Sequence, residues 1–462
     1  MHIEFYGASS GVTGSCHILR ANGQTLLLDC GLIQGRRKDM ERNRRPFPFH
    51  PNEIDAVVLS HGHIDHSGRI PLLVKQGYTG PIYAQNATVE LCEILLLDSA
   101  HLHERDADYE NKWRIRKGET PIDPLYTVRD AEASLGHFAG LRYGERREIL
   151  PGVEIRFVDA GHILGSASVE VWLSEGGRQQ KVVFSGDLGQ YDTPILNDPA
   201  AIEEADHVII ESTYGNRRHR ERDATTQEIG QIIREASNRR GNLLIPAFSI
   251  GRTQELLYYL GKYYDEWELD RWQVYLDSPM AIRASKVYWD YPQLYDEEAT
   301  RLRRHVHEMP QLQNLRFTLS PAESMAINQI KAGAIIIAAS GMCTGGRIVH
   351  HLKHNLARQG AHVMIVGFQA PGTLGRALVD GKTSVRIHGG DYPVRAAIHT
   401  VGGLSAHGDV DDLRRWISNF SNTPSVHVVH GEDDAKADFR ELLENELGLR
   451  AEIPGPGERI EL

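Results

Sequence analysis

The chain has 462 residues, of which 41% are hydrophobic and 24% are charged, and its net charge is −11 with the histidines neutral. A chain of this length exceeds one ordinary core, so we expect two domains. No apolar run approaches the roughly 18 to 20 residues that a membrane helix needs, so we expect no membrane-spanning helix. The acidic balance disfavours nucleic-acid binding that depends on overall charge alone.

The cysteines and the first residues indicate a compartment. Cys16, Cys30, Cys92 and Cys343 are scattered and form no CxxC pair, which disfavours a disulfide framework and a thiolate zinc site. The opening MHIEFYGAS places the charged Glu4 where a signal peptide needs an apolar core. We therefore expect a cytoplasmic protein with no membrane partner.

In chain order, the first part of the sequence reads mainly as short strands. These strands are HIEFYG, a hairpin around Asn22 and Gly23, IDAVVLS, VEIRFVDA, SASVEVWLS, KVVFSGD and HVIIEST. Helical patterns interrupt them at residues 68–77 and, less regularly, at residues 91–136.

The pattern changes after about residue 213. A strand at residues 242–248 is followed by a helix at 253–264, and this alternation repeats through HVMIVGF. Alternating strands and helices predict a parallel, Rossmann-like sheet. Short strands return near the end of the chain. We therefore predict a discontinuous domain of residues 1–212 and 389–462 that carries an inserted α/β domain of residues 213–388.

The densest chemistry lies in SHGHIDHSG, residues 60–68, directly after an apolar run. His61 and His63 are two residues apart and point the same way in an extended loop, whereas Asp65 and His66 can turn toward a second position. Imidazole and carboxylate ligands suit zinc and can leave a coordination position for water. A chance polar loop is the alternative, and a metal site is the stronger interpretation.

Three more candidate ligands follow strand-like runs elsewhere in the chain. His162 follows IRFVDA, Asp187 follows KVVF and His430 follows SVHVV. Each lies where a strand would deliver its side chain to one common edge of a sheet, which strengthens the metal interpretation.

These motifs, together with Asp29 in LLLDCG, resemble the metallo-β-lactamase fold. Glu211 in ESTYG, His407 in LSAHGD and His430 in VVHGE, with the insertion, resemble its β-CASP branch, whose members process nucleic acids. The chain is most similar to the RNA-cleaving group of the cleavage and polyadenylation specificity factor endonuclease and its bacterial and archaeal relatives. The resemblance implies an α/β protein, namely an αββα sandwich with an inserted Rossmann-like β-CASP domain.

The resemblance also implies a set of site residues. One zinc ion would be held by His61, His63 and His162, the other by Asp65, His66 and His430, with Asp187 as the bridge. The implied catalytic residues are Asp65, Glu211 and His407. For Asp29 we expect a bond to the backbone or to a ligand histidine, outside the metal's own ligands. Two Zn²⁺ per chain are expected, although iron and manganese accept the same ligands.

This arrangement implies a reaction. Two metal ions about 3.5 to 4 Å apart can lower the pKa of a shared water to near neutrality and so provide a hydroxide for attack on phosphorus. His407 would protonate the leaving group as general acid, and Glu211 would orient it. The family resemblance implies that the substrate is single-stranded RNA, cut endo- or exonucleolytically to leave a 5′-phosphate and a 3′-hydroxyl.

The inserted domain contributes three glycine-containing turns after strands, in FSIGR, SGMCTGGR and QAPGTLGR. Exposed amides at such turns can hold phosphate, and arginine adds a bidentate partner. Steric need is the ordinary reason for glycine there, but three turns on one domain favour phosphate binding. The candidate residues are Ser249, Arg252, Ser340, Gly341, Thr344, Gly345, Gly346, Arg347 and Arg376.

Other interpretations stay open. A hydrolase of small esters or thioesters could use the same metal scaffold, and a non-catalytic RNA-processing scaffold could keep the fold. The histidines of VHHLKHNL, His350, His351 and His354, lack a nearby carboxylate, so we expect a solvated or RNA-facing helix surface. Oligomeric state and protein partners are not predicted, and a homodimer is kept as one option.

Overall fold

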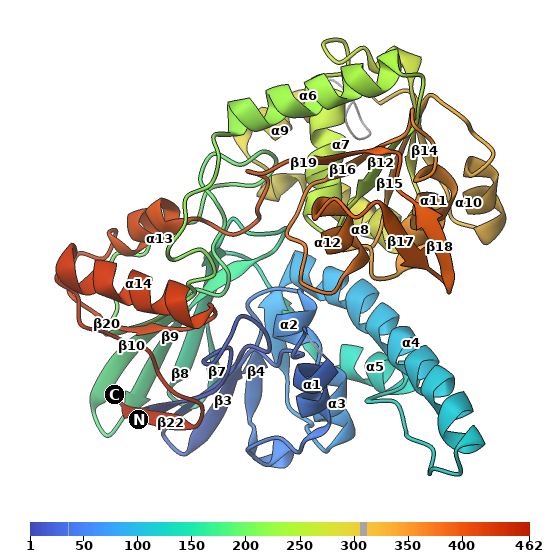
Figure 1. Ribbon diagram of the computed structural model, residues 1–462. Helices are drawn as coiled ribbons and strands as arrows, with labels where there is room; N and C mark the ends of the chain where they lie inside the picture. Colours follow the sequence, from blue (N-terminus) through green and yellow to red (C-terminus); the bar gives the residue numbers. More distant parts are fainter. Residues whose placement is uncertain (36, 305–311) are drawn as a thin grey trace. The chain divides into compact units, whose positions relative to one another are not determined.

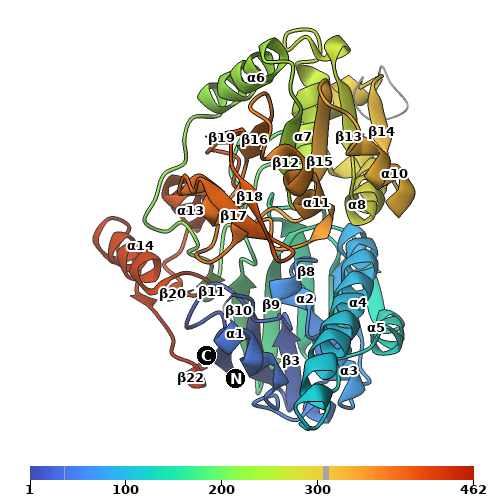
Figure 2. The same ribbon diagram turned by 45° about the vertical axis from the view of Figure 1, so that its right-hand side comes forward.

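The computed structural model describes residues 1–35, 37–304 and 312–462. These residues form two compact units, which Figures 1 and 2 show from two directions. Unit 1 comprises Met1–Thr193, Asn197–Arg218 and His407–Leu462. Unit 2 comprises Pro194–Leu196 and His219–Ala406, so a discontinuous unit carries an inserted one.

Unit 1 contains two sheets of seven strands each. The first has the order β22 (Glu458–Glu461), β1 (His2–Gly7), β2 (Cys16–Ala21), β3 (Gln24–Leu28), β4 (Ala56–Val58), β5 (Ile82–Gln85) and β6 (Phe138–Leu141). The second has the order β21 (Ala451–Glu452), β20 (Ser425–Val428), β11 (His207–Ile210), β10 (Arg178–Phe184), β9 (Ala167–Glu175), β8 (Val153–Asp159) and β7 (Arg146–Leu150).

Helices complete the layers of unit 1. They are α1 (Arg37–Met40), α2 (Ile64–Ser67), α3 (Ile70–Lys75), α4 (Asn86–Arg116), α5 (Val128–Leu135), α13 (Val410–Ile417) and α14 (Asp433–Asn445), with 3₁₀ turns at Glu41–Arg44 and Pro51–Glu53. One buried cluster joins the two sheets and includes Phe5, Leu26 and Val171. Separate clusters pack the first sheet against α4 and the second against α13 and α14. The predicted αββα arrangement is confirmed.

The strand directions bring several loops to one edge of unit 1. β3 and β4 run parallel, as do β10, β11 and β20. β8 and β10 both pair antiparallel with β9 and therefore share a direction. The carboxyl ends of parallel strands meet at the same edge, which is where ligand sites of such sheets form. The tight turn between β2 and β3 has positive φ at Asn22 (51°) and Gly23 (73°), as the predicted hairpin requires.

Unit 2 is built on a six-stranded sheet in which all the strand pairs are parallel. Its order is β14 (Leu315–Phe317), β13 (Gln273–Leu276), β15 (Ala334–Ala338), β12 (Leu243–Pro246), β16 (His362–Ile365) and β19 (Ala397–Thr400). The predicted Rossmann-like alternation is present. β19 lies beyond residue 388, the predicted end of the insertion. It nevertheless belongs to unit 2, because it pairs with β16 rather than with a strand of unit 1.

The remaining elements of unit 2 surround this sheet or extend it. The helices are α6 (Arg222–Asn238), α7 (Arg252–Lys262), α8 (Pro279–Asp290), α9 (Glu297–Arg304), α10 (Pro321–Ile327), α11 (Gly346–Asn355) and α12 (Leu374–Val379), with 3₁₀ turns at Leu269–Arg271 and Pro292–Leu294. A two-stranded hairpin joins β17 (Ser384–Ile387) to β18 (Gly390–Pro393).

Two expectations about location concern the whole chain. Within the described residues, none of the helices has the length and apolar character needed to cross a membrane. All four cysteines are buried and unbridged. The cytoplasmic location stays a prediction.

The core between the two sheets of unit 1 yields a stability prediction. Ile155 is fully buried on β8, so Ile155→Ala should lower the free energy of unfolding by about 2 to 5 kcal/mol through lost burial and the cavity left behind. Gln179→Ala on the exposed end of β10 is the matched control and should change it by less than about 0.5 kcal/mol. Equal urea unfolding curves for Ile155→Ala and wild type would contradict this placement of the core.

Candidate metal centre

The candidate ligands of unit 1 all follow strands at the shared edge. His61 and His63 lie in the loop after β4, and His63 immediately precedes α2. The single turn of α2 carries Asp65 and His66 on neighbouring positions. His162, Asp187 and His430 come from the loops after β8, β10 and β20. The structure therefore brings together residues that are up to 369 positions apart, as the sequence predicts.

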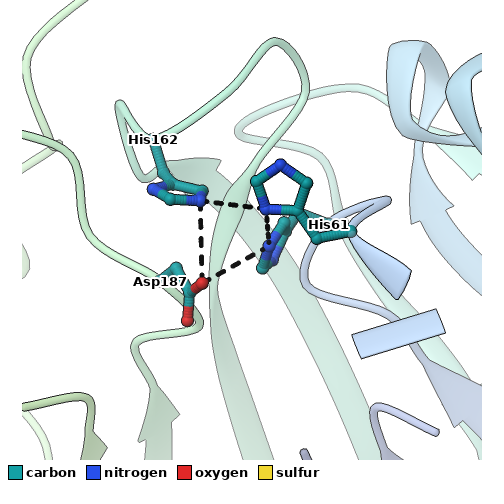
Figure 3. A group of neighbouring side chains, drawn as sticks. His61, His162 and Asp187 are labelled. Carbon is teal, nitrogen blue, oxygen red and sulfur yellow. Dashed lines mark hydrogen bonds and ion pairs between the residues drawn. The ribbon is translucent and has the colours of Figure 1, made fainter. Parts of the chain in front are cut away.

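Three imidazoles converge on one point. His63 Nδ1 lies 3.1 Å from His61 Nε2 and 3.2 Å from His162 Nε2. Nitrogens bound to one tetrahedral zinc at 2.0 to 2.1 Å lie about 3.3 Å apart, so this spacing fits the edges of a zinc coordination shell. Figure 3 shows His61 and His162 turned toward Asp187.

A second group forms beside the first. His66 Nε2 lies 3.0 Å from His430 Nε2, and Asp65 Oδ2 lies 3.9 and 3.7 Å from these two nitrogens. The donor atoms of these three residues all fall within 4.8 Å of one another, the same limit that holds for His61, His63, His162 and Asp187. Two adjacent groups of nitrogen and oxygen donors fit two divalent cations.

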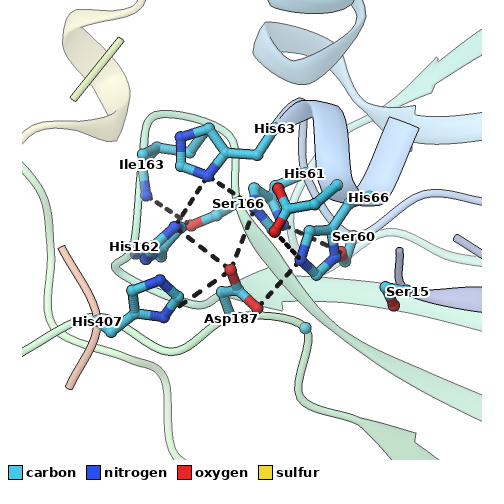
Figure 4. Close-up of polar contacts among 12 residues, drawn as sticks. Ser15, Ser60, His61, His63, His66, His162, Ile163, Ser166, Asp187 and His407 are labelled. Carbon is cyan, nitrogen blue, oxygen red and sulfur yellow. Dashed lines mark hydrogen bonds and ion pairs between the residues drawn. The ribbon is translucent and has the colours of Figure 1, made fainter. Parts of the chain in front are cut away.

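Asp187 lies between the two groups and faces both. Its Oδ2 is 3.5 Å from His61 Nε2 and 3.6 Å from His162 Nε2. Its Oδ1 is 3.3 Å from His66 Nε2 and 3.5 Å from His430 Nε2. Figure 4 shows the carboxylate among the imidazoles of His61, His66 and His162. Each oxygen is thus directed at one group, so the carboxylate could be a ligand shared by both groups.

The local environment sets protonation states that suit metal binding. Burial lowers the pKa of His61 well below its ordinary value and lowers that of His63 to about 4, so both rings are neutral and can offer a lone pair. Burial raises the pKa of the Asp65 carboxyl, but the hydrogen bond to His430 and the charge of His66 outweigh it and lower the pKa to about 2. Asp65 is therefore ionised at neutral pH.

Asp29 contacts Nδ1 of His66, the ring nitrogen on the side away from the other ligands. Its Oδ2 lies 2.7 Å from His66 Nδ1 and accepts hydrogen bonds from the hydroxyls of Ser15 and Ser60, while its Oδ1 accepts from the Ser60 amide. Such a carboxylate fixes the tautomer and orientation of a ligand histidine. Asp29 has a positive φ of 58°, a conformation in which Asp and Asn are enriched.

Two supporting residues escape sequence reasoning. The Ser166 hydroxyl accepts hydrogen bonds from the amides of His162 and Ile163 and so shapes the loop that presents His162 (Figure 4). The Thr213 hydroxyl lies 3.1 Å from Nδ1 of His430. An isolated serine or threonine gives no signal in a single sequence, because these residues are common in ordinary loops.

Glu211 and His407 form a pair next to the metal ligands. Both carboxylate oxygens of Glu211 lie 3.1 Å from His407 Nδ1, and this nitrogen is 3.9 Å from Asp187 Oδ2. Glu211 is buried and accepts hydrogen bonds from the amides of Leu188 and Thr213. Burial lowers the pKa of His407, but the carboxylates of Glu211 and Asp187 outweigh it and raise the pKa to about 9.

The predicted phosphate-binding turns lie at one edge of the sheet of unit 2. They follow β12, β15 and β16, which are neighbouring parallel strands. The residues concerned are Ser249, Arg252, Ser340, Gly341, Thr344, Gly345, Gly346, Arg347 and Arg376. A side chain at Gly346 would meet the Ala339 carbonyl at 2.2 Å, so close backbone approach explains this glycine without any ligand.

The three arginines of these turns already have carboxylate partners within unit 2. Arg252 pairs with Glu255 at 2.6 Å and Arg376 with Asp380 at 2.8 Å. Arg347 pairs with Asp277 at 2.7 Å and also donates to two carbonyls. Phosphate binding by these residues stays a prediction.

Asp277 also changes the interpretation of one histidine. His351 on α11 is fully buried, and its Nε2 lies 2.6 Å from Asp277 Oδ2. The expectation of a solvated or RNA-facing position is wrong for His351, because its carboxylate partner comes from a residue 74 positions away that sequence spacing does not reveal.

Comparison with protein families matches three models along the chain. Residues 10–226 match the metallo-beta-lactamase superfamily, residues 253–378 the Beta-Casp domain, and residues 391–454 the Zn-dependent metallo-hydrolase RNA specificity domain. Ribonuclease TTHA0252 of Thermus thermophilus is 38% identical over 443 residues, which cover 96% of both chains. The chain belongs to the β-CASP family of metallo-β-lactamase-fold RNA-processing nucleases. The predicted family and fold class are confirmed, and so is the predicted enzyme class at the level of the family.

Two further comparisons give a more distant relative in sequence and a protein that shares the fold. Transcription termination factor FttA of Methanocaldococcus jannaschii is 29% identical over 98% of this chain and 70% of its own length. A crystal structure of a protein of unknown function from Enterococcus faecalis shares the fold with a TM-score of 0.57 at 13% identity, over 100% of this chain and 99% of that one. The family and the clustered donors together establish a metal cofactor.

Removing the charge of Asp29 should weaken metal binding. Asp29→Asn keeps the size and tolerates the positive φ but removes the carboxylate at His66, so the affinity for the metal held by His66 should fall about 10- to 100-fold. Competitive titration with a chromogenic chelator measures this. Asp123→Asn, which changes an exposed carboxylate of the same unit, should leave the affinity unchanged. Equal affinities for both variants would show that Asp29 does not support the centre.

Proposed function

We propose that this protein is a ribonuclease that hydrolyses phosphodiester bonds of single-stranded RNA with two zinc ions per chain. The observation that carries this proposal is the position of Asp187, whose two oxygens each face a separate group of ligand side chains. The printed name of the Thermus thermophilus relative, a ribonuclease, supports the substrate class.

The residues present fit two zinc ions. His61, His63 and His162 would hold one ion, and Asp65, His66 and His430 the other, with Asp187 shared. When bound, the ions supply Lewis acidity toward the phosphate and an activated water. The neutral rings of His61 and His63 offer lone pairs, and the ionised carboxylates of Asp65 and Asp187 offset the cationic charge.

The proton for the leaving oxygen comes from His407. Glu211 engages Nδ1 of this ring, which leaves Nε2 as the nitrogen that delivers the proton. The backbone amides of Leu188 and Thr213 hold the Glu211 carboxylate, so the orientation of the imidazole is fixed before RNA binds. An acid with a pKa of about 9 is protonated at neutral pH.

The alternatives receive less support. A non-catalytic scaffold would not need the complete set of seven ligands that converge here. A hydrolase of small esters needs no imidazole paired with a buried carboxylate beside the ligands, since an ester leaving group departs more easily than the alkoxide of RNA. Cleavage mode, polarity and sequence preference are outside this proposal.

Loss of the acid should abolish most of the activity while the metals stay bound. His407→Ala should slow cleavage of 5′-end-labelled single-stranded RNA by about 10²- to 10⁴-fold, the usual contribution of a general acid. His50→Ala, at an exposed histidine of the same unit, should cleave like wild type. Undiminished cleavage by His407→Ala with two zinc ions bound would remove His407 from the reaction.

His407 and Glu211 should also set the alkaline limb of the pH profile of kcat/KM. His407 acts only when protonated, so kcat/KM should fall as the pH rises above the pKa of about 9. Bound cations oppose the carboxylates and move this limb toward neutral pH. Glu211→Gln removes the charge that raises the pKa, so its limb should lie at lower pH than that of wild type. Superimposable profiles would contradict the role of Glu211.

A further inference from the structure

The C-terminal half of α4 exposes several large side chains. Tyr109 is 66% exposed and Trp113 is 51% exposed. Leu102, two helical turns before Tyr109, is 46% exposed. Lys112 and Arg116 are also exposed. Positions 109, 112, 113 and 116 follow the i, i+3, i+4, i+7 spacing, so these four side chains share one face of the helix. We call this face the α4 platform.

The opposite face of the helix is fixed to the rest of unit 1. The Asn111 side chain donates to the Ile122 carbonyl at 2.9 Å and accepts from the Ile122 amide at 2.7 Å. Arg114 Nε donates to the Thr120 carbonyl at 2.7 Å. In Figure 1 this end of α4 lies at the outer edge of unit 1. The other face of the helix is therefore anchored by hydrogen bonds, and the platform faces solvent.

The charge of the platform is positive. Lys112 and Arg116 alternate with the two aromatic rings, and Lys117 follows directly at the end of the helix. The Arg116 guanidinium lies 5.3 Å from the centre of the Trp113 ring, so the cation and the ring already form one surface. Glu110 is directed to Arg114 on the flank of the helix, at 3.6 Å. None of the four platform residues is a carboxylate, and the exposed Asp106 and Asp108 lie one turn before Tyr109 and Lys112.

This composition fits a single strand of nucleic acid better than a second protein surface. Bases stack on exposed aromatic rings, and neighbouring cations neutralise the phosphates. Protein interfaces are also enriched in tyrosine, tryptophan and arginine but are depleted in lysine, so Lys112 and Lys117 favour the nucleic acid. The chain as a whole carries a charge of −11, so any hold on a polyanion outside the metal centre depends on local cationic surfaces of this kind.

We propose that the α4 platform is a second binding site for single-stranded RNA, with bases stacked on Tyr109 and Trp113 and phosphates contacted by Lys112 and Arg116. The identity of the polymer rests on the proposed function. None of these residues belongs to the metal centre, and the platform adds affinity for RNA that extends beyond the segment being cut. The sequence preference is weak, because every base offers a face for stacking.

Binding of a fluorescein-labelled single-stranded RNA of about 20 nucleotides to the full chain tests the proposal. The His407→Ala background keeps the RNA intact, and fluorescence anisotropy gives the Kd. Trp113→Ala should raise the Kd about tenfold, the range expected for one lost base stack. Trp113→Phe should retain most of the affinity. Lys112→Ala with Arg116→Ala should reduce the slope of log Kd against log salt by about 1.4, or about 0.7 for each phosphate contact.

Matched variants separate the platform from general effects. Ile115→Ala removes a side chain that is 63% exposed on the same helix end but is not one of the four platform residues, and Arg178→Ala removes an exposed cation at the start of β10. Both should bind RNA like the background protein. An unchanged Kd for Trp113→Ala, or an equal loss for Ile115→Ala, would overturn the proposal. If Trp113→Ala left the Kd unchanged but dissociated a dimer in gel filtration, the face would be a contact between two copies of the chain, and this result would also overturn the proposal.

The outcomes also separate this proposal from the proposed function. Cleavage of the same RNA by the wild-type chain reports on the nuclease, whereas the Kd series reports on the platform. Weakened binding by Trp113→Ala together with inert wild-type protein would leave the platform standing and overturn the nuclease. Active wild-type protein with an unchanged Kd for Trp113→Ala would do the opposite.

Discussion

The contact on which the rest of unit 1 depends is the approach of four imidazoles to the two oxygens of Asp187. A buried carboxylate is costly unless cations or protons compensate for its charge. The histidine nitrogens stand 3.3 to 3.6 Å from the oxygens, with separate partners for Oδ1 and Oδ2. Two bound cations would satisfy the carboxylate and relieve the crowding of the nitrogens at once.

The geometry of the sheets brings these imidazoles to the Asp187 carboxylate. Parallel strands from both sheets end at one edge, so loops that are distant in sequence deliver short side chains to the same place. The acid pair uses the same edge: Glu211 follows β11, the neighbour of β10, which precedes Asp187. The carboxylates of Asp187 and Glu211 are therefore neighbours, and both raise the pKa of His407.

The metal ligands could be predicted from the sequence, because each of them follows an apolar strand pattern. This holds for the dense SHGHIDHSG motif and for His162, Asp187 and His430. Hydrophobic periodicity also predicted the alternating elements of unit 2. The extent of the insertion could not be predicted, because a short strand such as β19 carries no mark of the sheet it joins. The partners of Arg347 and His351 were equally hidden, since Asp277 meets them only through tertiary packing.

The most direct test of the central claim is anomalous diffraction at the zinc edge from crystals of the zinc-loaded protein. Two peaks about 3.5 to 4 Å apart are expected, with Asp187 between them. One peak should be surrounded by His61, His63 and His162, and the other by Asp65, His66 and His430. A single peak, or peaks at other residues, would contradict a bridged pair of metal ions.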